Sequence, residues 1–226
     1  MDDVRLTLAD ELLLLALREE DGSALIGSAE LDCGVAGALL AELALAERVQ
    51  LVDGRVVAAD QSPLGDPDLD GLLASITADG KPRKAEQWVS RTRRDEIRKR
   101  RLGRLAAIGI LEEREHKFLF FKHTSYPERD PGPEQELRAR LRAVLDGAPA
   151  DERSGALLAI VHACRLDRKA FPDVDGKVLR GRVREITEEQ WAGRAVAKVI
   201  ASIHAAVMAA TSAAVIASNA ATMSSG

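Results

Sequence analysis

The segment CGVAGALLAELALAE, residues 33–47, decides the fold class. Its apolar residues occupy every side of a helix instead of one face, which is typical of a helix buried at the centre of a protein. Hydrophobic residues make up 46% of the chain and aromatic residues only 3%, a combination that favours helices packed closely through small side chains. We therefore expect a mostly α, compact single-domain helical bundle with buried central helices, amphipathic outer helices and two short β-hairpins.

Clear local signals lie on both sides of this segment. Thr7 and Asp10 have the spacing of a capping box and predict a helix from Leu8 to Glu19. Downstream, two β-branched runs flank Asp53-Gly54, a dipeptide typical of tight hairpin turns. We predict that this first hairpin covers Val49–Ala58.

The rest of the chain is predicted to be helical apart from a second hairpin. The predicted elements are helices at Leu69–Asp79, Lys84–Ile108, Glu134–Leu145, Ser154–Cys164, Lys177–Ile186 and Glu188–Ala217, and a hairpin at Ile110–Lys122 with its tip at Glu115–Lys117. Gly109 stands where glycine commonly ends a helix. We expect one domain over residues 1–218, followed by a frayed or disordered tail at residues 219–226.

The cysteines and the hydropathy of the chain indicate the cellular compartment in which the protein is expected. Cys33 and Cys164 each lie among small apolar residues, which indicates buried free thiols and a reducing environment. The acidic N-terminus does not match a secretory signal, and Lys198 and His204 interrupt the apolar stretch Ala192–Met223. We therefore expect a cytoplasmic protein without a membrane-spanning helix.

The sequence contains no recognisable catalytic or cofactor motif. The four histidines are too scattered to form a helical metal pair, and no phosphate loop, dinucleotide loop or nucleophile elbow occurs. Asp66, Asp68 and Asp70 alternate, but the closing ligands of a calcium loop are missing, so we interpret them as a solvated acidic turn. We expect a protein that is not an enzyme and that needs neither a cofactor nor a metal.

One stretch has an unusual charge. Between Lys81 and Arg104 there are eleven Lys and Arg residues and three acids, a local net charge of +8 in a chain whose total is -4. On a continuous helix, Arg91, Arg94, Arg98 and Arg101 would share one face. Guanidinium groups suit phosphate oxygens, so these four residues are the candidate binding site for an external phosphate.

Three interpretations of this basic face are open. The first is an anionic phospholipid surface, which attracts clustered Lys and Arg. The second is DNA, since a helix followed by a hairpin is similar to a winged-helix regulator; poor helix-turn-helix spacing and the mixed charge of the hairpin make nucleic acid less favoured. In the third, the face is neutralised by internal acids such as Glu112, Glu113 and the Asp66–Asp70 loop.

Four segments together resemble one known family. They are LTLADELLLLALREEDG (residues 6–22), LLAELALAERVQL (residues 39–51), RLAAIGILEEREHKFLFFKHTSYP (residues 104–127) and ALLAIVHACRL (residues 156–166). In order and spacing they resemble the Golgi phosphoprotein 3 family over about Leu6 to His204. The Ala- and Arg-rich composition is similar to that of bacterial, actinobacterial members.

The resemblance implies a function at membranes. Eukaryotic relatives are peripheral membrane proteins that bind phosphatidylinositol 4-phosphate and act as adaptors for Golgi glycosyltransferases. The family's Trp and Arg correspond to Gly27 and Ala36, and its pair of arginines corresponds to Asp95 and Arg98. Only Arg98 matches, and helical spacing offers Arg94 and Arg91 as replacements for the missing guanidinium. We expect such a protein at the inner face of the membrane.

The resemblance also implies self-association through the second hairpin. In the family this hairpin mediates contacts between copies, and here it corresponds to Glu112–Tyr126. Phe118, Phe120 and Phe121 would be costly to leave exposed in a monomer. The alternative is that Phe118 and Phe120 face the core.

Overall fold

A computed structural model describes residues 5–118, 121–186 and 195–223 of the chain. Helices make up 63% of the structure, and the two strand pairs are short and antiparallel, so the prediction of a mostly α fold is confirmed. The elements are α1 (Leu8–Ala16), α2 (Ser28–Leu45), β1 (Val49–Val52), β2 (Arg55–Ala58), α3 (Pro67–Ala78), α4 (Ala85–Thr92), α5 (Asp95–Ala107), β3 (Arg114–Phe118), β4 (Phe121–Ser125), α6 (Gly132–Leu145), α7 (Glu152–Ala163), α8 (Asp167–Ala170), α9 (Gly176–Glu185) and α10 (Ala195–Met223).

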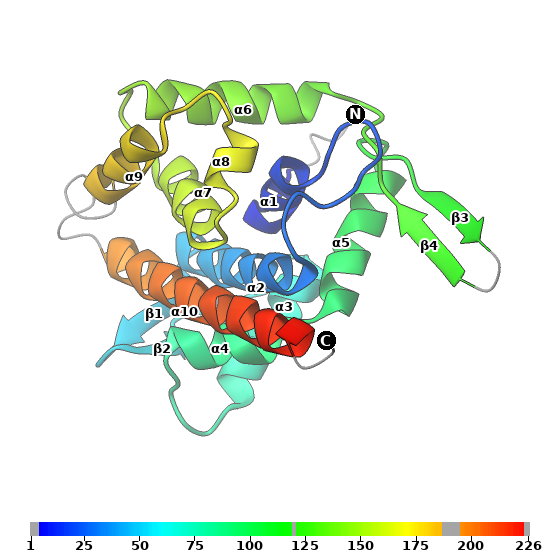
Figure 1. Ribbon diagram of the computed structural model, residues 1–226. Coiled ribbons are helices and arrows are strands. Elements are labelled where there is room, and N and C mark those ends of the chain that lie inside the picture. Colours follow the sequence, from blue (N-terminus) through cyan, green and yellow to red (C-terminus); the bar gives the residue numbers. More distant parts are fainter. Residues whose placement is uncertain (1–4, 119–120, 187–194, 224–226) are drawn as a thin grey trace.

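Helix α2 is the centre of the bundle, as its sequence predicts. It packs against α1, α3, α4, α5, α7 and α10, and these helices surround it in Figure 1. Two glycines allow the close approach: a Cβ on Gly34 would lie 2.5 Å from Cys164 Sγ, and one on Gly37 would lie 2.4 Å from Val207 Cγ2. Both cysteines are free and buried, as predicted.

Helix α1 begins with the predicted capping box. Thr7 Oγ1 accepts a hydrogen bond from the backbone N–H of Asp10, and the Asp10 carboxylate accepts one from the backbone N–H of Thr7 at 2.9 Å. The helix ends at Ala16, short of the predicted Glu19, because Leu17 leaves it to pair with Ala24 in an isolated β-bridge.

The first hairpin matches its prediction, whereas the second differs in register. Asp53 and Gly54 turn between β1 and β2 with φ values of 50° and 70°. In the second hairpin Arg114 pairs with Ser125 and Phe118 with Phe121, so Glu115–Lys117 lie within strand β3 and the predicted tip there is wrong. Strand β3 begins at Arg114 and not at the predicted Ile110; before it, the Glu112 N–H donates to the Pro127 carbonyl and Leu111 pairs with Glu128 in an isolated β-bridge.

The predicted single helix Lys84–Ile108 is wrong, because the structure breaks it into α4 and α5. Arg93 and Arg94 are extended, with ψ values of 106° and 137°. No Gly or Pro marks the break; it lets α4 bury Trp88 and Val89 while α5 buries a separate set of side chains. Here tertiary packing overrides helix propensity.

The second half of the chain consists of helices around α2. The predicted boundaries of α6, α7 and α9 agree with the structure to within a few residues, and the short α8 was not predicted. Helix α10 continues past its predicted end at Ala217 to Met223, into the predicted tail. By length and composition, residues 196–217 could cross a membrane, with a mean hydropathy of 2.0, and a third of this stretch is buried in the fold.

Candidate anion-binding site

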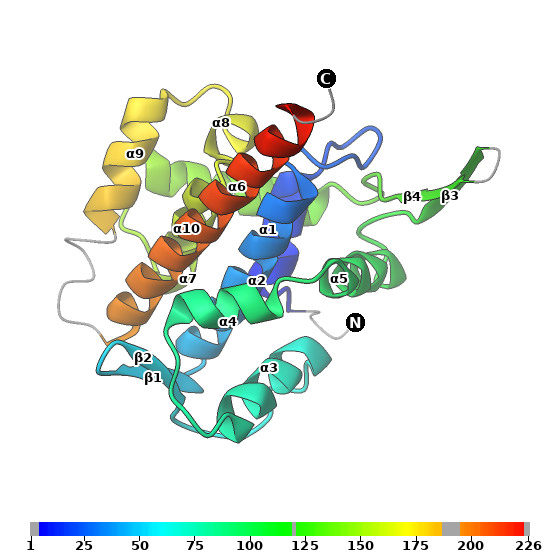
Figure 2. The same cartoon turned by 60° about the horizontal axis from the view of Figure 1, so that its bottom comes forward.

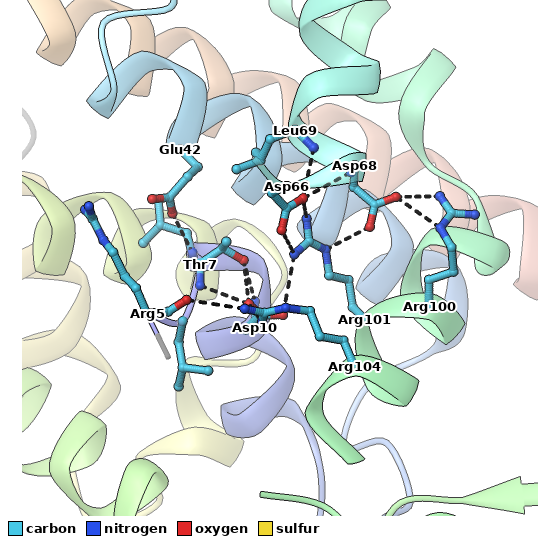
Figure 3. Close-up of polar contacts among 12 residues, drawn as sticks. Arg5, Thr7, Asp10, Glu42, Asp66, Asp68, Leu69, Arg100, Arg101 and Arg104 are labelled. Atoms are coloured by element: carbon cyan, nitrogen blue, oxygen red, sulfur yellow. Dashed lines mark hydrogen bonds and ion pairs between the residues drawn. The ribbon is translucent and has the colours of Figure 1, made fainter. Parts of the chain in front are cut away.

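The C-terminal part of the basic stretch is held inside the protein. Arg101 on α5 is only 1% exposed, and its guanidinium lies against three carboxylates, with Nη1 2.6 Å from Asp66 Oδ2 and Nε 3.0 Å from Asp68 Oδ2 (Figure 3). Asp10 on α1 is the third, with its Oδ1 3.8 Å from Arg101 Nη1. The prediction that Arg101 belongs to an exposed face is therefore wrong.

The prediction of a solvated acidic turn at Asp66, Asp68 and Asp70 is also wrong, because Asp66 and Asp68 hold the buried Arg101 and Asp70 accepts backbone hydrogen bonds from Leu64 and Gly65. Asp66 caps α3 by accepting hydrogen bonds from the backbone N–H groups of Asp68 and Leu69. Although burial raises the pKa of Asp66, the hydrogen bond and charge of Arg101 bring the pKa of this carboxyl below its ordinary value overall. The Asp66 carboxylate thus stays ionised and compensates the charge of the buried guanidinium.

Neighbouring arginines extend this cluster along α5. Arg104 Nη1 lies 2.6 Å from Asp10 Oδ2, and Arg100 Nε donates to Asp68 Oδ1 at 3.1 Å (Figure 3). Three acids from α1 and the start of α3 therefore clamp one side of α5. For this part of the stretch, the interpretation of internal neutralisation is confirmed through the Asp66–Asp70 loop.

Arg98 is also engaged by an internal acid. Its Nε donates to Asp32 Oδ1 on α2 at 2.6 Å, and the Arg98 side chain is 18% exposed. Gly27, which precedes α2, has the carboxylate of Glu30 next to its Cα, and Ala36 is buried. At the positions to which the family resemblance points, a glycine thus lies beside the Glu30 carboxylate, an alanine is buried, and the one matching guanidinium is neutralised by Asp32.

Three arginines at the break between α4 and α5 form a different environment, and we call them the junction arginines: Arg91, Arg93 and Arg94. All three are exposed. Arg91 is 54% exposed, stacks over the Trp88 ring at 5.4 Å from the centroid, and places Nη1 2.9 Å from Asp79 Oδ2. Asp79 also bonds Arg83, so a single carboxylate serves two guanidinium groups.

Arg93 and Arg94 are less compensated than Arg91. Arg93 Nη1 lies 3.9 Å from Cys33 Sγ, but burial raises the pKa of this thiol, so the sulfur is neutral and leaves the positive charge of Arg93 in place. Among residues 5–118, 121–186 and 195–223, no ion-pair or hydrogen-bond partner occurs for the Arg94 side chain. The helix break, which the sequence did not reveal, is what exposes these two residues together.

The junction arginines line a groove of about 1000 Å³ between α3, α4 and α5. A second groove of about 680 Å³ adjoins it and shares Ser90 and Arg91. The charged and hydroxyl-bearing residues of the two grooves are Asp68, Ser75, Ser90, Arg91, Thr92, Arg93, Arg94, Glu96 and Arg100 in the first, and Arg55, Arg83, Lys84, Glu86, Ser90 and Arg91 in the second. Cations outnumber acids in both, so the surface suits an anion.

Sequence reasoning found two of the junction arginines and missed the third. Arg91 and Arg94 were predicted on the face, whereas Arg93 falls on the opposite side of a continuous helix. Asp95 and Glu96, which occupy the first turn of α5, are the signal that could have located a helix start there. A new N-terminus at residue 95 turns Arg93 and Arg94 into linker residues.

The other predicted site lies largely beyond what the structure describes. Phe118 and Phe121 are paired in the β3–β4 register, and Phe120 lies outside the described residues. Self-association through Glu112–Tyr126 stays a prediction, although the hairpin projects from the bundle (Figure 2). Among the described residues, no group of three His, Cys, Asp or Glu side chains is placed to hold a metal ion.

The chain was also compared with protein families. The family model described as Golgi phosphoprotein 3 (GPP34) matches residues 8–203. The match begins at the first residue of α1 and ends within α10, so it includes the central helix, both hairpins and the junction arginines.

Proposed function

The chain belongs to the Golgi phosphoprotein 3 family, and from this premise we propose that it is a peripheral membrane protein that binds anionic phospholipid. The proposed ligand is a headgroup like that of phosphatidylinositol 4-phosphate, and the proposed binding residues are the junction arginines. The protein would act at the cytoplasmic face of the membrane, as a binding protein or adaptor without an enzymatic reaction. The proposal names no client protein for an adaptor role.

The observation that carries this proposal is the contrast in charge compensation. Arg93 and Arg94 are exposed, adjacent and without a carboxylate partner in the described parts of the chain, beside a groove of about 1000 Å³. Guanidinium groups bind phosphate oxygens through paired N–H donors, and a headgroup monophosphate presents several such oxygens. Arg91 can add a third guanidinium, although it shares Asp79 with Arg83.

This site differs from the one that the resemblance implies. Arg98 would have to leave Asp32, which lies 2.6 Å away, before it could bind a phosphate. Because the binding groups are arginines on an exposed linker, the attraction is mainly electrostatic, at about 1 kcal/mol for each cation near an anionic leaflet. We therefore expect binding that weakens as salt rises.

The structure does not favour the alternative of a winged-helix DNA-binding regulator. A recognition helix needs cations that reach the DNA, but on α5 the guanidinium groups of Arg98, Arg100 and Arg104 are already bonded to carboxylates. Arg101 is buried altogether. Few cations on this helix are left to contact a phosphate backbone.

Co-sedimentation with vesicles tests the proposal. The variant Arg93→Glu/Arg94→Glu should lose binding to vesicles that contain phosphatidylinositol 4-phosphate or phosphatidylserine. The matched control is Lys177→Glu/Arg180→Glu, which makes the same change in net charge at two exposed positions of α9, away from α4 in Figure 1. Equal binding by the two double variants would show that net charge, and not the junction, governs the interaction.

A further inference from the structure

The exposed face of α10 is apolar along most of the helix. From Val199 to Met223 the sequence has no Asp, Glu, Lys or Arg. Alanines recur every fourth residue on the exposed side, and two larger apolar side chains lie beside them, Met208 at 38% exposure and Ile216 at 70%. We call these residues the α10 stripe: Ala201, Ala205, Met208, Ala209, Ala213, Ile216 and Ala217.

Burial in the bundle does not account for this apolar character. The other strongly apolar long helix, α2, is buried over nearly all of Leu31–Ala44. In α10 a stretch of 22 residues has a mean hydropathy of 2.0, yet only a third of it is buried. Surface helices of globular proteins normally carry charged residues on the side that faces water. The α10 stripe therefore resembles a surface that meets something other than water.

The stripe lies next to the cationic junction. Helix α10 packs against α4, and the two helices lie side by side in Figure 1. Helix α4 ends at Thr92, directly before Arg93 and Arg94. A surface that is apolar along one helix and positively charged at its neighbour is complementary to an anionic bilayer, with its phosphates above an acyl layer.

We infer that the α10 stripe enters the boundary between headgroups and acyl chains of an anionic bilayer, with its helix parallel to the membrane plane. This inference rests on the proposed function, in which the junction arginines hold the lipid phosphates. Interfacial helices bury their apolar face to a depth of about 5–10 Å and keep a polar face towards water. In α10 the protein body takes the place of that polar face.

A second copy of the chain is a weaker candidate for covering the stripe. Stable protein interfaces bury about 800 Å² on each partner and draw on about 20–30 residues a side. The α10 stripe is one helix wide and contains seven residues, five of them alanines. A bilayer needs neither a wide patch nor a matching shape, so it is the occupant that these observations favour.

A probe at the centre of the stripe tests the inference. Both native cysteines are buried, so a thiol-reactive fluorophore will label an introduced Ala209→Cys. On vesicles with about 30 mol% phosphatidylserine, a lipid content that attracts basic surfaces, the probe should shift its emission to the blue and be quenched by nitroxide-labelled lipid. A probe at Ala143→Cys, an exposed position of α6, should show neither change.

A charge placed on the stripe gives the matching loss-of-function test. Ala205→Asp/Ala209→Asp should weaken partitioning onto these vesicles roughly tenfold, since a carboxylate resists entry into the membrane. The exposed alanine of α6 supplies the control, Ala143→Asp, which should leave partitioning unchanged. Unchanged circular dichroism would show that the stripe variant still folds.

The possible outcomes separate this inference from the proposed function. If the protein sediments with vesicles but the probe at residue 209 stays in water, the inference is wrong and lipid binding by the junction arginines stands. If no anionic vesicle binds, both are wrong. A lipid-free dimer in analytical ultracentrifugation that Ala205→Asp/Ala209→Asp abolishes would also overturn the inference, because a second copy would then cover the stripe.

Discussion

Two segments of the basic stretch, residues 91–94 and residues 98–104, are both rich in arginine but lie in opposite environments. Residues 98–104 carry five cations, and each of the four arginines among them is bonded to a carboxylate of α1, α2 or α3. Residues 91–94 carry three arginines, and only Arg91 has a carboxylate partner in the described parts of the chain. Local charge density alone therefore does not identify a binding surface; the position of the acids in the fold does.

The comparison also separates stability from binding. The C-terminal arginines stabilise the attachment of α5, whereas the junction arginines contribute little to the packing of the bundle. Substitutions in the two groups should therefore affect different measurements. The predictions below test this division, from the largest expected effect to the smallest.

Removal of the buried guanidinium should have the largest effect. Arg101→Ala leaves the partly buried Asp66 carboxylate without its guanidinium partner, removes one of the two arginines beside Asp68 and beside Asp10, and should lower the free energy of unfolding by about 3–5 kcal/mol. Arg94→Ala, at an exposed position without a partner in the described residues, should stay within about 0.5 kcal/mol. Urea denaturation measures both values, and similar losses in the two variants would contradict the division.

Neutralising the junction should affect membrane binding instead. Arg93→Ala/Arg94→Ala should weaken binding to anionic vesicles roughly 30-fold, which corresponds to about 1 kcal/mol for each arginine. The free energy of unfolding should hardly change, because both side chains are exposed. A flotation assay over a series of lipid concentrations measures the affinity. If binding survives while stability falls, the assignment of roles is reversed.

Arg98 can be converted from an internally paired arginine into one that is available for binding, as the junction arginines are. Asp32→Asn removes the carboxylate that lies 2.6 Å from Arg98 Nε, so the Arg98 guanidinium loses its counter-charge and becomes available to lipid phosphate. Binding to anionic vesicles should become roughly fivefold tighter, close to the contribution of one cation that has lost its internal counter-ion. In the same assay, the double variant Asp32→Asn/Arg98→Gln should bind with the parental affinity. A gain that persists in this double variant would have another cause.

Low pH should weaken the ion pair between Asp66 and Arg101 and so lower the stability of the fold. The pKa of Asp66 is below its ordinary value in the folded chain, so the stability it contributes is present above the ordinary pKa and is lost as the pH falls through the lowered one. The free energy of unfolding should therefore fall below about pH 4, and less steeply in Asp66→Asn. Chemical denaturation at several pH values measures this slope. Parallel slopes in the two proteins would show that Asp66 does not contribute.

Most of the architecture could be predicted from the sequence because its signals are local. The capping box at Thr7, the Asp53-Gly54 turn and the apolar segment at residues 33–47 each fix an element through neighbouring residues. The break at Arg93 and Arg94 depends on contacts far along the chain, including Arg101 with Asp10 and Arg98 with Asp32. Residues so far apart in sequence give no periodic signal.

The candidate site was harder to predict than the fold for the same reason. A helical projection places Arg91, Arg94, Arg98 and Arg101 on one face, and this is correct only if the helix is continuous. Whether a guanidinium is exposed then depends on which acids the tertiary structure brings close. The family resemblance pointed to the basic stretch but could not show that Arg98 is bonded to Asp32.

Side-chain NMR of the arginine Nε–H groups tests the central claim most directly. The protein would be titrated with a short-chain phosphatidylinositol 4-phosphate, and each signal would be assigned by single Arg→Lys substitutions. We predict saturable shifts for Arg93 and Arg94, a smaller one for Arg91, and none for Arg101 and Arg104. Shifts confined to Arg98, Arg101 and Arg104, or no shift at any arginine, would contradict the account.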